Sequence, residues 1–209
     1  TKTEQAVINF IARGLAINPR SKYIHTSYSD SLANDNAAKI KDIVLMPEFN
    51  ELWGLDVRTD TKAKKKWFTE QGGGMMAAAS GGQITGFRAG RMEDGFTGAF
   101  IIDDPVKPDD AYSAVKRSTI NNRFNNTMRS RLAHEDIPMI VILQRIQAED
   151  LCGYLLEGAS GDIWHHLKIP ALITDEHLSD DYPETFTHGK PININKVLES
   201  LSDGEPYEF

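Results

Sequence analysis

Two short apolar runs, each ending in polar residues, constrain the fold of this chain more than any other feature. Residues 99–102 read Ala-Phe-Ile-Ile and lead into Asp103-Asp104-Pro105, and residues 138–143 read Pro-Met-Ile-Val-Ile-Leu and lead into Gln144-Arg145. Such runs are typical of buried strands. One helix separates them, so we expect a right-handed βαβ unit with parallel strands. The polar residues then meet at the carboxyl edge of the sheet, where open α/β sheets bind ligands.

The tandem acids favour nucleotide hydrolysis. In phosphate-binding ATPases the first acid of such a pair helps to hold Mg²⁺, and the second orients or deprotonates the attacking water. Gln144 would lie beside Asp103 and Asp104, where its amide would sense the γ-phosphate or that water. The strand end alone leaves a plainer interpretation open, because an Asp at this position often only caps a loop or helix. Gln144 would then make an ordinary hydrogen bond at a strand end.

The first residues of the chain resemble the end of a phosphate loop. Lys2-Thr3 precedes apolar residues at helical spacing, from Ala6 to Leu15. A phosphate loop ends in Lys-[Ser/Thr] and opens into such a helix, whose N-terminus favours anions. Lys2 would reach the β- and γ-phosphates, and Thr3 would ligate Mg²⁺. Thr1 stands where such a loop usually has its last glycine, and the glycine-rich turn lies outside the sequence. We therefore expect a truncated domain that binds nucleotide poorly by itself.

The remaining pattern alternates between strands and helices. We expect a strand over 22–27, a helix from Ser29 or Asp30 to about residue 44, and a β-hairpin around 66–80. The glycine-dense segment 81–91 is predicted to be a flexible loop that presents Arg88 and Arg91. A helix should follow from residue 109 or 113 to about 132, and a further strand over 163–169.

Charge is distributed unevenly along the chain. The formal net charge of −7 argues against non-specific attraction of nucleic acid over the whole surface. Residues 112–133 nevertheless carry five basic residues and no acid. This segment is either a solvated face or a surface that contacts DNA or a neighbouring subunit. Two interpretations are likewise open for lysines 62 and 64–66, which either form a solvated strand edge or contact a phosphate backbone. The basic residues of the segment 112–133 are Lys116, Arg117, Arg123, Arg129 and Arg131.

The composition of the chain indicates the cellular compartment and the number of domains. Cys152 is the only cysteine, which rules out an internal disulfide, fits a reducing compartment and favours a buried, inert thiol. The sequence holds no apolar run of the roughly 18 residues needed to cross a bilayer and no signal-peptide pattern at its start. We expect a cytosolic protein with no membrane contact. Residues 1–173 are predicted to form one domain, and residues 174–209 a weakly packed linker.

The order and spacing of these segments resemble the ATPase domain of the large terminase subunit of tailed bacteriophages over roughly residues 1–170. The segments that carry the resemblance are Lys2-Thr3-Glu4, residues 28–33 (Tyr-Ser-Asp-Ser-Leu-Ala), residues 81–86 (Gly-Gly-Gln-Ile-Thr-Gly), residues 101–105 (Ile-Ile-Asp-Asp-Pro), residues 130–132 (Ser-Arg-Leu), Gln144-Arg145 and residues 149–153 (Glu-Asp-Leu-Cys-Gly).

The resemblance implies an α/β fold of the RecA-like P-loop class with an additional strand: a mostly parallel sheet flanked by helices, with a β-hairpin insertion around 66–80. It implies a Mg²⁺-dependent ATP hydrolase that moves double-stranded DNA into a procapsid, with ATP and Mg²⁺ as cofactors. The implied partners are double-stranded DNA, the portal protein, the small terminase subunit and further copies of the chain in a ring on the portal. The implied location is the host cytoplasm, with transient docking on the procapsid.

The resemblance also implies individual roles. Lys2 and Thr3 take the phosphate-loop roles, Asp103 at the end of the Walker B strand takes the Mg²⁺ role, and Asp104 becomes the catalytic carboxylate. Gln144 falls in the segment that couples hydrolysis to movement. The family uses an arginine supplied between neighbouring subunits, for which Arg91 and Arg88 are the first candidates. Arg117, Arg123, Arg129 and Arg131 remain candidates for contact with DNA or with a subunit.

The chain departs from the family pattern in two further ways. Asp104 is one methylene shorter than the Glu often found at that position, and nothing after residue 174 supplies the acidic cluster that a two-metal nuclease domain requires. Two other functions stay open at this stage. One is a P-loop helicase or remodelling ATPase, and the other is a non-catalytic module that binds the portal or DNA through residues 112–133.

Overall fold

The structure is a computed structural model that describes residues 1–59 and 63–167. The chain divides into two compact units, Thr1–Tyr154 and Leu155–Phe209. Only residues 155–167 of the second unit are described, and 163–167 form neither strand nor helix, so the strand expected over 163–169 is not present there. The domain boundary expected at residue 173 and the linker expected over 174–209 lie outside the described residues.

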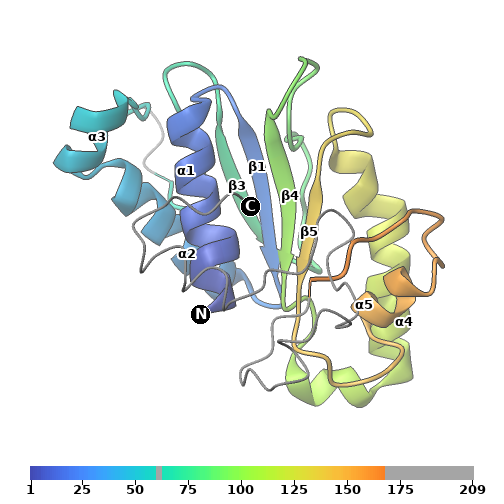
Figure 1. The fold of residues 1–209 in the computed structure, drawn as a ribbon. Coiled ribbons are helices and arrows are strands. Elements are labelled where there is room, and N and C mark those ends of the chain that lie inside the picture. The colour runs from blue at the N-terminus through green and yellow to red at the C-terminus, as the bar shows by residue number, and fades with distance from the viewer. Residues whose placement is uncertain (60–62, 168–209) are drawn as a thin grey trace, which may run out of the picture. The chain divides into compact units, whose positions relative to one another are not determined.

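A five-stranded, mostly parallel sheet organises the first unit (Figure 1). Its strands are β1 (Lys22–Ser27), β2 (Lys66–Phe68), β3 (Gly74–Ala79), β4 (Gly98–Asp103) and β5 (Met139–Ile142), in the order β2-β3-β1-β4-β5. Strands β3, β1, β4 and β5 are parallel neighbours, and only β2 is antiparallel, to β3. This confirms the α/β class, the βαβ unit and the strand over 22–27.

The predicted hairpin is present, but it is not an insertion. Strands β2 and β3 pair in antiparallel register around Gly72 and Gly73, as expected. However, β3 pairs along its whole length with β1 and so belongs to the parallel part of the sheet. The physical reason is burial: the first five residues of β3 are buried, as is expected for a central strand covered on both faces.

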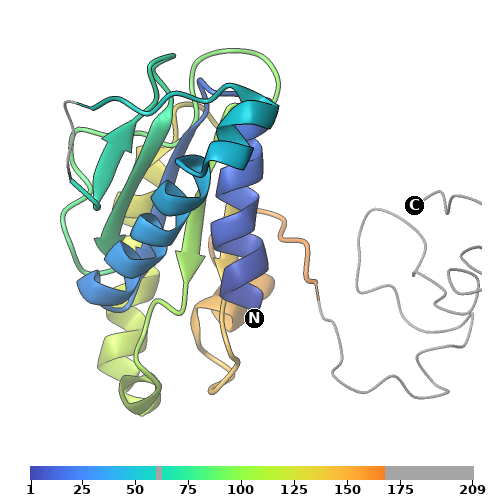
Figure 2. The same ribbon diagram turned by 90° about the vertical axis from the view of Figure 1, so that its left-hand side faces the viewer.

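Helices at the start of the chain cover one face of the sheet. A π-helical segment, Glu4–Asn9, continues directly into α1 (Phe10–Ile17), and α2 (Asp30–Val44) follows β1. The N-cap of α2 is Ser29, whose hydroxyl accepts a hydrogen bond from the backbone N–H of Leu32 at 3.2 Å, as predicted. Figures 1 and 2 show α1 and α2 on the same side of the sheet. The core between these layers includes Val7, Ile11, Leu15, Ile40, Tyr23, Trp67, Met75 and Ile101.

A second helical layer lies on the other side (Figure 2). A 3₁₀ turn, Pro108–Tyr112, leads to Ser113, whose side chain caps α4 (Ala114–Arg123). The helical path continues through a π turn, Phe124–Met128, and a 3₁₀ turn, Arg129–Arg131. Apolar residues four apart, at positions 120, 124, 128 and 132, predict a face of this segment that packs on the core, and the first three, Ile120, Phe124 and Met128, are buried. Helix α5 (Leu151–Leu156) follows β5.

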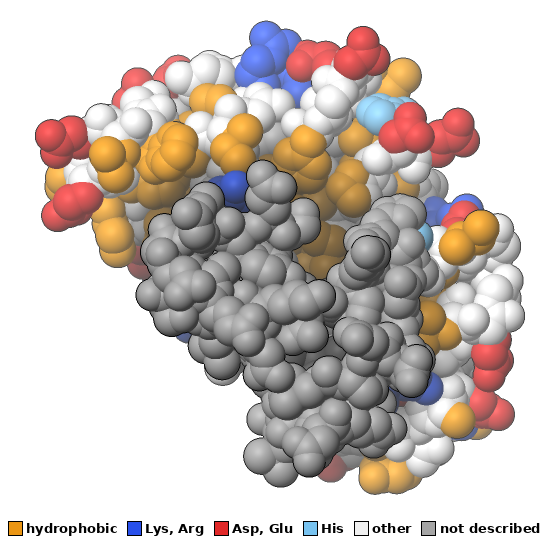
Figure 3. Space-filling view, in the orientation of Figure 1, with side chains coloured by type: hydrophobic (Ala, Val, Ile, Leu, Met, Phe, Trp, Pro, Cys, Tyr) orange, Lys and Arg blue, Asp and Glu red, His pale blue; other side chains and the backbone are white. Residues whose placement is uncertain are grey.

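Hydrophobic side chains also remain on the surface. The short helix α3 (Pro47–Trp53) buries none of its residues, and Leu52 and Trp53 are exposed. Figure 3 shows hydrophobic side chains gathered on the face that carries α1 and α3. Across residues 1–59 and 63–167, no helix combines the length and apolar character that a membrane crossing requires.

Burial raises the pKa of the half-buried Cys152 thiol to about 11, which leaves it protonated and unreactive at neutral pH.

Candidate functional site

The carboxyl ends of β1, β4 and β5 meet at one edge of the sheet, as the βαβ prediction requires. The backbone N–H of Asp104 donates to Ile142 of β5 at 2.9 Å, and the carbonyl of Asp104 accepts from the N–H of Tyr28, just after β1, at 2.9 Å. The backbone N–H of Gln144 in turn faces an oxygen of the Asp104 carboxylate at 3.4 Å. The predicted neighbourhood of Asp104 and Gln144 is therefore confirmed. The Gln144 side chain is exposed at this edge.

The amino-terminal residues come to the same edge. The hydroxyl of Thr3 donates to Oδ2 of Asp103 at 2.8 Å, across one hundred positions of sequence. The ammonium of Lys2 donates to the carbonyl of Leu143, after β5, at 3.3 Å. The π-helical segment and α1 hold both residues in place, since this helix is anchored by its buried face on the sheet. Lys2, Thr3 and the tandem aspartates thus surround one point.

Asp103 is an ionisable group in a buried place. Only 2% of its surface is exposed, and burial raises the pKa of its carboxyl above the ordinary value. The hydrogen bond from Thr3 and the charge of Lys2 lower that pKa, while the charge of Asp104 raises it. The second oxygen, Oδ1, is buried without a hydrogen-bond partner among the described residues. A group that binds here and carries positive charge would satisfy that oxygen.

These side chains fit a magnesium ion. Mg²⁺ usually binds to one or two carboxylates, keeps several waters and contacts substrate phosphates. A buried carboxylate with one unsatisfied oxygen, next to the Thr3 hydroxyl, offers such ligands. Within residues 1–59 and 63–167 there is no group of three or more His, Cys, Asp or Glu that would form a metal site by itself.

Asp104 has an uncommon backbone conformation. Its φ is +44°, and no other non-glycine residue in the described part of the chain has a positive φ. The backbone hydrogen bonds to Ile142 and Tyr28 hold it there. The left-handed region costs an L-residue free energy, although Asp tolerates it better than most residues. These contacts with the ends of β5 and β1 therefore set the position of the half-buried Asp104 carboxylate. Functional sites often contain such strained positions.

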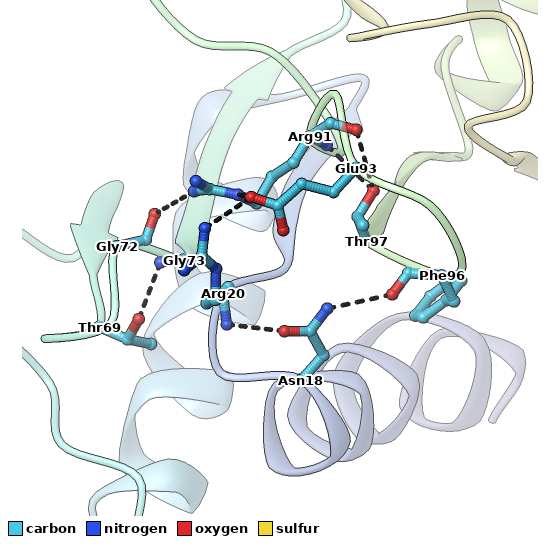
Figure 4. A network of polar contacts seen from close by, with 9 residues as sticks. All are labelled: Asn18, Arg20, Thr69, Gly72, Gly73, Arg91, Glu93, Phe96 and Thr97. Atoms are coloured by element: carbon cyan, nitrogen blue, oxygen red, sulfur yellow. Dashed lines mark hydrogen bonds and ion pairs between the residues drawn. The ribbon is translucent and has the colours of Figure 1, made fainter.

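Arg91 and Arg88 lie away from these groups. The backbone N–H of Arg91 donates to the Thr97 hydroxyl at 3.0 Å, just before β4 begins, so Arg91 sits at the opposite edge of the sheet from Asp104. Strand β4, which lies between them, is about 16 Å long. The guanidinium of Arg91 forms an ion pair with Glu93 at 3.0 Å and donates to the carbonyl of Gly72 at 3.2 Å (Figure 4). Within one chain Arg91 therefore does not reach the Asp104 carboxylate.

The loop over 81–91 is anchored at its end rather than free. Ala89 pairs with Leu132 in a β-bridge, and the backbone N–H of Gly90 donates to Lys22 at 2.9 Å. The guanidinium of Arg88 donates to the carbonyl of Leu132 at 3.0 Å. Arg88 is exposed, as predicted, but its position is set by these contacts.

The basic residues of the α4 region are engaged mostly within the chain. Arg117 pairs with Glu149 at 3.0 Å and donates to the carbonyl of Ala111, and its side chain is only 12% exposed. Arg123 donates to the carbonyl of Gly82. Arg131 contacts the Ser130 hydroxyl, and Arg129 is half-buried. The structure thus brings these four residues to one continuous helical segment, α4 and the two turns that follow it.

Sequence reasoning missed several buried polar groups next to the site. The hydroxyls of Thr26, Ser27 and Ser80 are buried at the ends of β1 and β3, without partners among the described residues. His25 contacts the Asn36 amide at 3.2 Å, and burial lowers the pKa of His25 to about 4. The only signal in the sequence was polar residues in a strand that is otherwise apolar.

No known protein-family model matches this chain, and no curated protein matches it at a significant level of similarity.

Proposed function

We propose that this chain is a Mg²⁺-dependent ATPase domain of RecA-like architecture that belongs to a motor for packaging viral DNA, of the large terminase type. One observation carries the proposal: the hydrogen bond between the Thr3 hydroxyl and the buried Asp103 carboxylate. It joins the Lys-Thr pair at a helix start to the end of an apolar strand, which is the arrangement that a phosphate-loop ATPase uses around its metal ion.

In the proposed reaction each residue has one task. Lys2 binds the β- and γ-phosphates, and Thr3 and Asp103 hold the metal ion. Mg²⁺, when bound, neutralises charge on the phosphate oxygens. Asp104 orients the attacking water and accepts its proton, and its backbone, which is bonded to β1 and β5, keeps that carboxylate in place. Gln144 extends from the same edge and lies where its amide would respond to the γ-phosphate.

The proposed assembly supplies the missing positive charge in trans. Copies of the chain would form a ring on a portal protein, with double-stranded DNA and a small terminase subunit as further partners. Arg91 or Arg88 of one copy would then act on the phosphates bound by its neighbour. Their place at the far edge of the sheet suits a contact between subunits rather than within one.

Hydrolysis tests the proposal directly. Phosphate release from Mg²⁺-ATP is measured for the protein and for the variants Asp103→Ala and Asp104→Asn, with Asp109→Asn, an exposed acid outside the site, as the matched control. We expect the first two variants to lose at least a hundredfold in rate and the control to match the unmodified protein. Unchanged hydrolysis in both site variants would overturn the assignment.

Weak binding by the chain is measured independently of turnover. A ligand at ten times its Kd stabilises the folded state by about 1.4 kcal/mol, which raises the melting temperature of a chain of this size by about 3–6 °C. We expect millimolar Mg²⁺-ATP to produce such a rise in the unmodified protein and not in Asp103→Ala. No rise at any concentration in either protein would count against a nucleotide site.

The arginine in trans is tested by mixing variants. Arg91→Ala and Asp104→Asn subunits are each expected to be inactive alone. Mixed rings contain some interfaces with an intact Arg91 facing an intact Asp104, so part of the activity should return. If neither Arg91→Ala nor Arg88→Ala lowers activity, these arginines are not the residues that act between subunits.

A further inference from the structure

A group of cations lies at the edge of the sheet opposite the carboxylates. Lys22 begins β1 at this edge, and Arg91 is bound to the loop just before β4. Lys66 lies on the antiparallel strand β2, opposite Met76, two residues into β3. By strand register, Lys22 and Lys66 are on the same face of the sheet, the one not covered by α1 and α2. We call Lys22, Lys66 and Arg91, with the rings of Phe68 and Phe87 beneath them, the basic edge patch.

Aromatic rings rather than carboxylates hold the two lysines. The ammonium of Lys22 lies 5.9 Å from the centre of the Phe87 ring, and that of Lys66 lies 5.7 Å from the centres of both Phe87 and Phe68. Such cation–π contacts fix a positive charge without neutralising it. Among the described residues neither lysine has a carboxylate within 4 Å. Burial lowers the pKa of Lys22, and the nearby charges of Arg91 and Lys66 lower it further.

Among the described residues, one acid pairs with cations of this group. Glu93 binds both Arg20, at 2.6 Å, and Arg91, at 3.0 Å (Figure 4). Two of the four cations therefore share one carboxylate, and Lys22 and Lys66 have no such partner among the described residues, in a chain whose net charge is −7. Gathering like charges costs free energy in the isolated protein, and a polyanion would return that free energy by neutralising them. The patch thus complements a ligand with several negative charges at its surface.

The burial of the Phe87 ring favours one class of polyanion over another. Proteins that bind single strands stack the bases on exposed aromatic faces. Phe87 is 6% exposed and lies beneath the ammonium groups, so it offers no face for a base. What remains for a ligand is positive charge, which suits the phosphates of a duplex whose bases are already stacked. The arginines of the α4 region are less suited, because Arg117 and Arg123 are engaged inside the chain.

We propose that the basic edge patch binds the phosphate backbone of double-stranded DNA independently of its sequence, at the end of β1 and β4 opposite the nucleotide site. This inference rests on the proposed function in that DNA is the substrate being moved. The two sites would be separated by one strand length, about 16 Å, so DNA and nucleotide would bind without competing. Strands β1 and β4 would connect them directly.

The test measures binding of a labelled duplex by fluorescence anisotropy over a range of salt concentrations. The variants are Lys22→Gln, Lys66→Gln and the double variant, and Lys39→Gln on α2, an exposed lysine outside the patch, is the matched control. Each lysine that contacts a phosphate contributes about one unit to the slope of log K against log salt. We expect the double variant to lose about two units of slope and at least tenfold in affinity near 0.1 M salt, and the control to keep both.

Three outcomes would overturn the inference. They are an unchanged salt slope in the double variant, an equal loss in Lys39→Gln, and equal affinity for a single strand of the same total charge. Lys66→Gln keeps the test valid if Lys22→Gln fails to fold, because Lys66 is half-buried on an edge strand and should lose about one unit of slope alone. Far-UV circular dichroism and melting curves identify any variant that is misfolded.

The same preparation separates this inference from the proposed ATPase function. The unmodified protein is also tested for stabilisation by Mg²⁺-ATP. Duplex binding that depends on the two lysines, in a protein that Mg²⁺-ATP does not stabilise, supports the patch and contradicts the ATPase. Stabilisation by Mg²⁺-ATP with no effect of the lysines on duplex binding supports the ATPase and contradicts the patch.

Discussion

Replacing Thr3 with Val tests the contact on which the site depends. Val keeps the branched shape of Thr but removes the hydroxyl that donates to Asp103 at 2.8 Å. Because Oδ1 of Asp103 already lacks a partner among the described residues, the buried carboxylate would lose its side-chain donor as well. Hydrogen bonds to charged groups contribute about 1.5–3 kcal/mol. Thr3 is only half-buried, so we expect a loss of about 2 kcal/mol at neutral pH.

The loss should depend on pH in a defined direction. Burial places the pKa of Asp103 above its ordinary value of 3.8, and the Thr3 hydroxyl lowers it. Without that hydroxyl the folded-state pKa rises further. A group whose pKa is higher in the folded state binds more protons there, so stability falls as pH rises from 3.8 to the folded-state pKa. The difference between Thr3→Val and the unmodified protein is therefore smallest in acid and complete at neutral pH.

Urea unfolding followed by tryptophan fluorescence measures this difference, since Trp67 is fully buried and should change its emission on unfolding. Thr3→Ser, which retains a hydroxyl, is the control and should lose much less stability. Asp103→Asn removes the buried charge yet keeps an acceptor for Thr3, so it should be at least as stable as the unmodified protein at pH 7.5. Equal stability of Thr3→Val and the unmodified protein at pH 7.5, or an Asp103→Asn variant as unstable as Thr3→Val, would refute the reasoning.

Substitutions at three further positions probe the site and the packing of the sheet. At Asp104 the φ of +44° favours glycine, so Asp104→Gly should be about 1 kcal/mol more stable to urea than Asp104→Ala, although both lose the carboxylate. His25 has a folded-state pKa of about 4, so the unfolded chain binds more protons between pH 6.5 and 4. The protein should lose about 3 kcal/mol as pH falls through that range, and His25→Gln should reduce the slope. A Cβ at Gly73 would meet the carbonyl oxygens of Pro19 and Ser21, so Gly73→Ala should cost about 2–3 kcal/mol in urea unfolding, whereas Gly81→Ala, which meets nothing, should be nearly neutral.

Elements with a local signal were predictable from the sequence. The strand over 22–27 and the helix over 30–44 have the expected bounds, because a buried β-rich run and the Ser29 cap each define an element through nearby residues. The meeting of Asp104 and Gln144 was also predictable, since parallel strands joined by one helix must end at the same edge. These inferences needed only periodicity, capping and the handedness of the connection.

Features that depend on distant contacts were not predictable. The apolar run of β3 does not say which strand it pairs with, so the hairpin was interpreted as an insertion. The sequence predicts a flexible loop around Arg88 and Arg91, yet backbone hydrogen bonds from Gly90 to Lys22, and between Ala89 and residues 131 and 133, fix its end. The left-handed backbone of Asp104 leaves no trace in the sequence, because Asp is common at strand ends for other reasons.

Several energetically unfavourable groups lie at the carboxyl edge of the sheet. At the carboxyl edge, the chain has a buried carboxylate with a raised pKa, an Asp with positive φ and several buried hydroxyls without partners among the described residues. Each of these costs free energy, and simple substitutions would relieve the first two. At the opposite edge, Glu93, Arg91 and Gly72 form a satisfied polar network (Figure 4). Unfavourable groups that lie next to a hydroxyl and an ammonium group are expected of a site whose ligand supplies the missing partners. A site that merely capped a loop would need none of them.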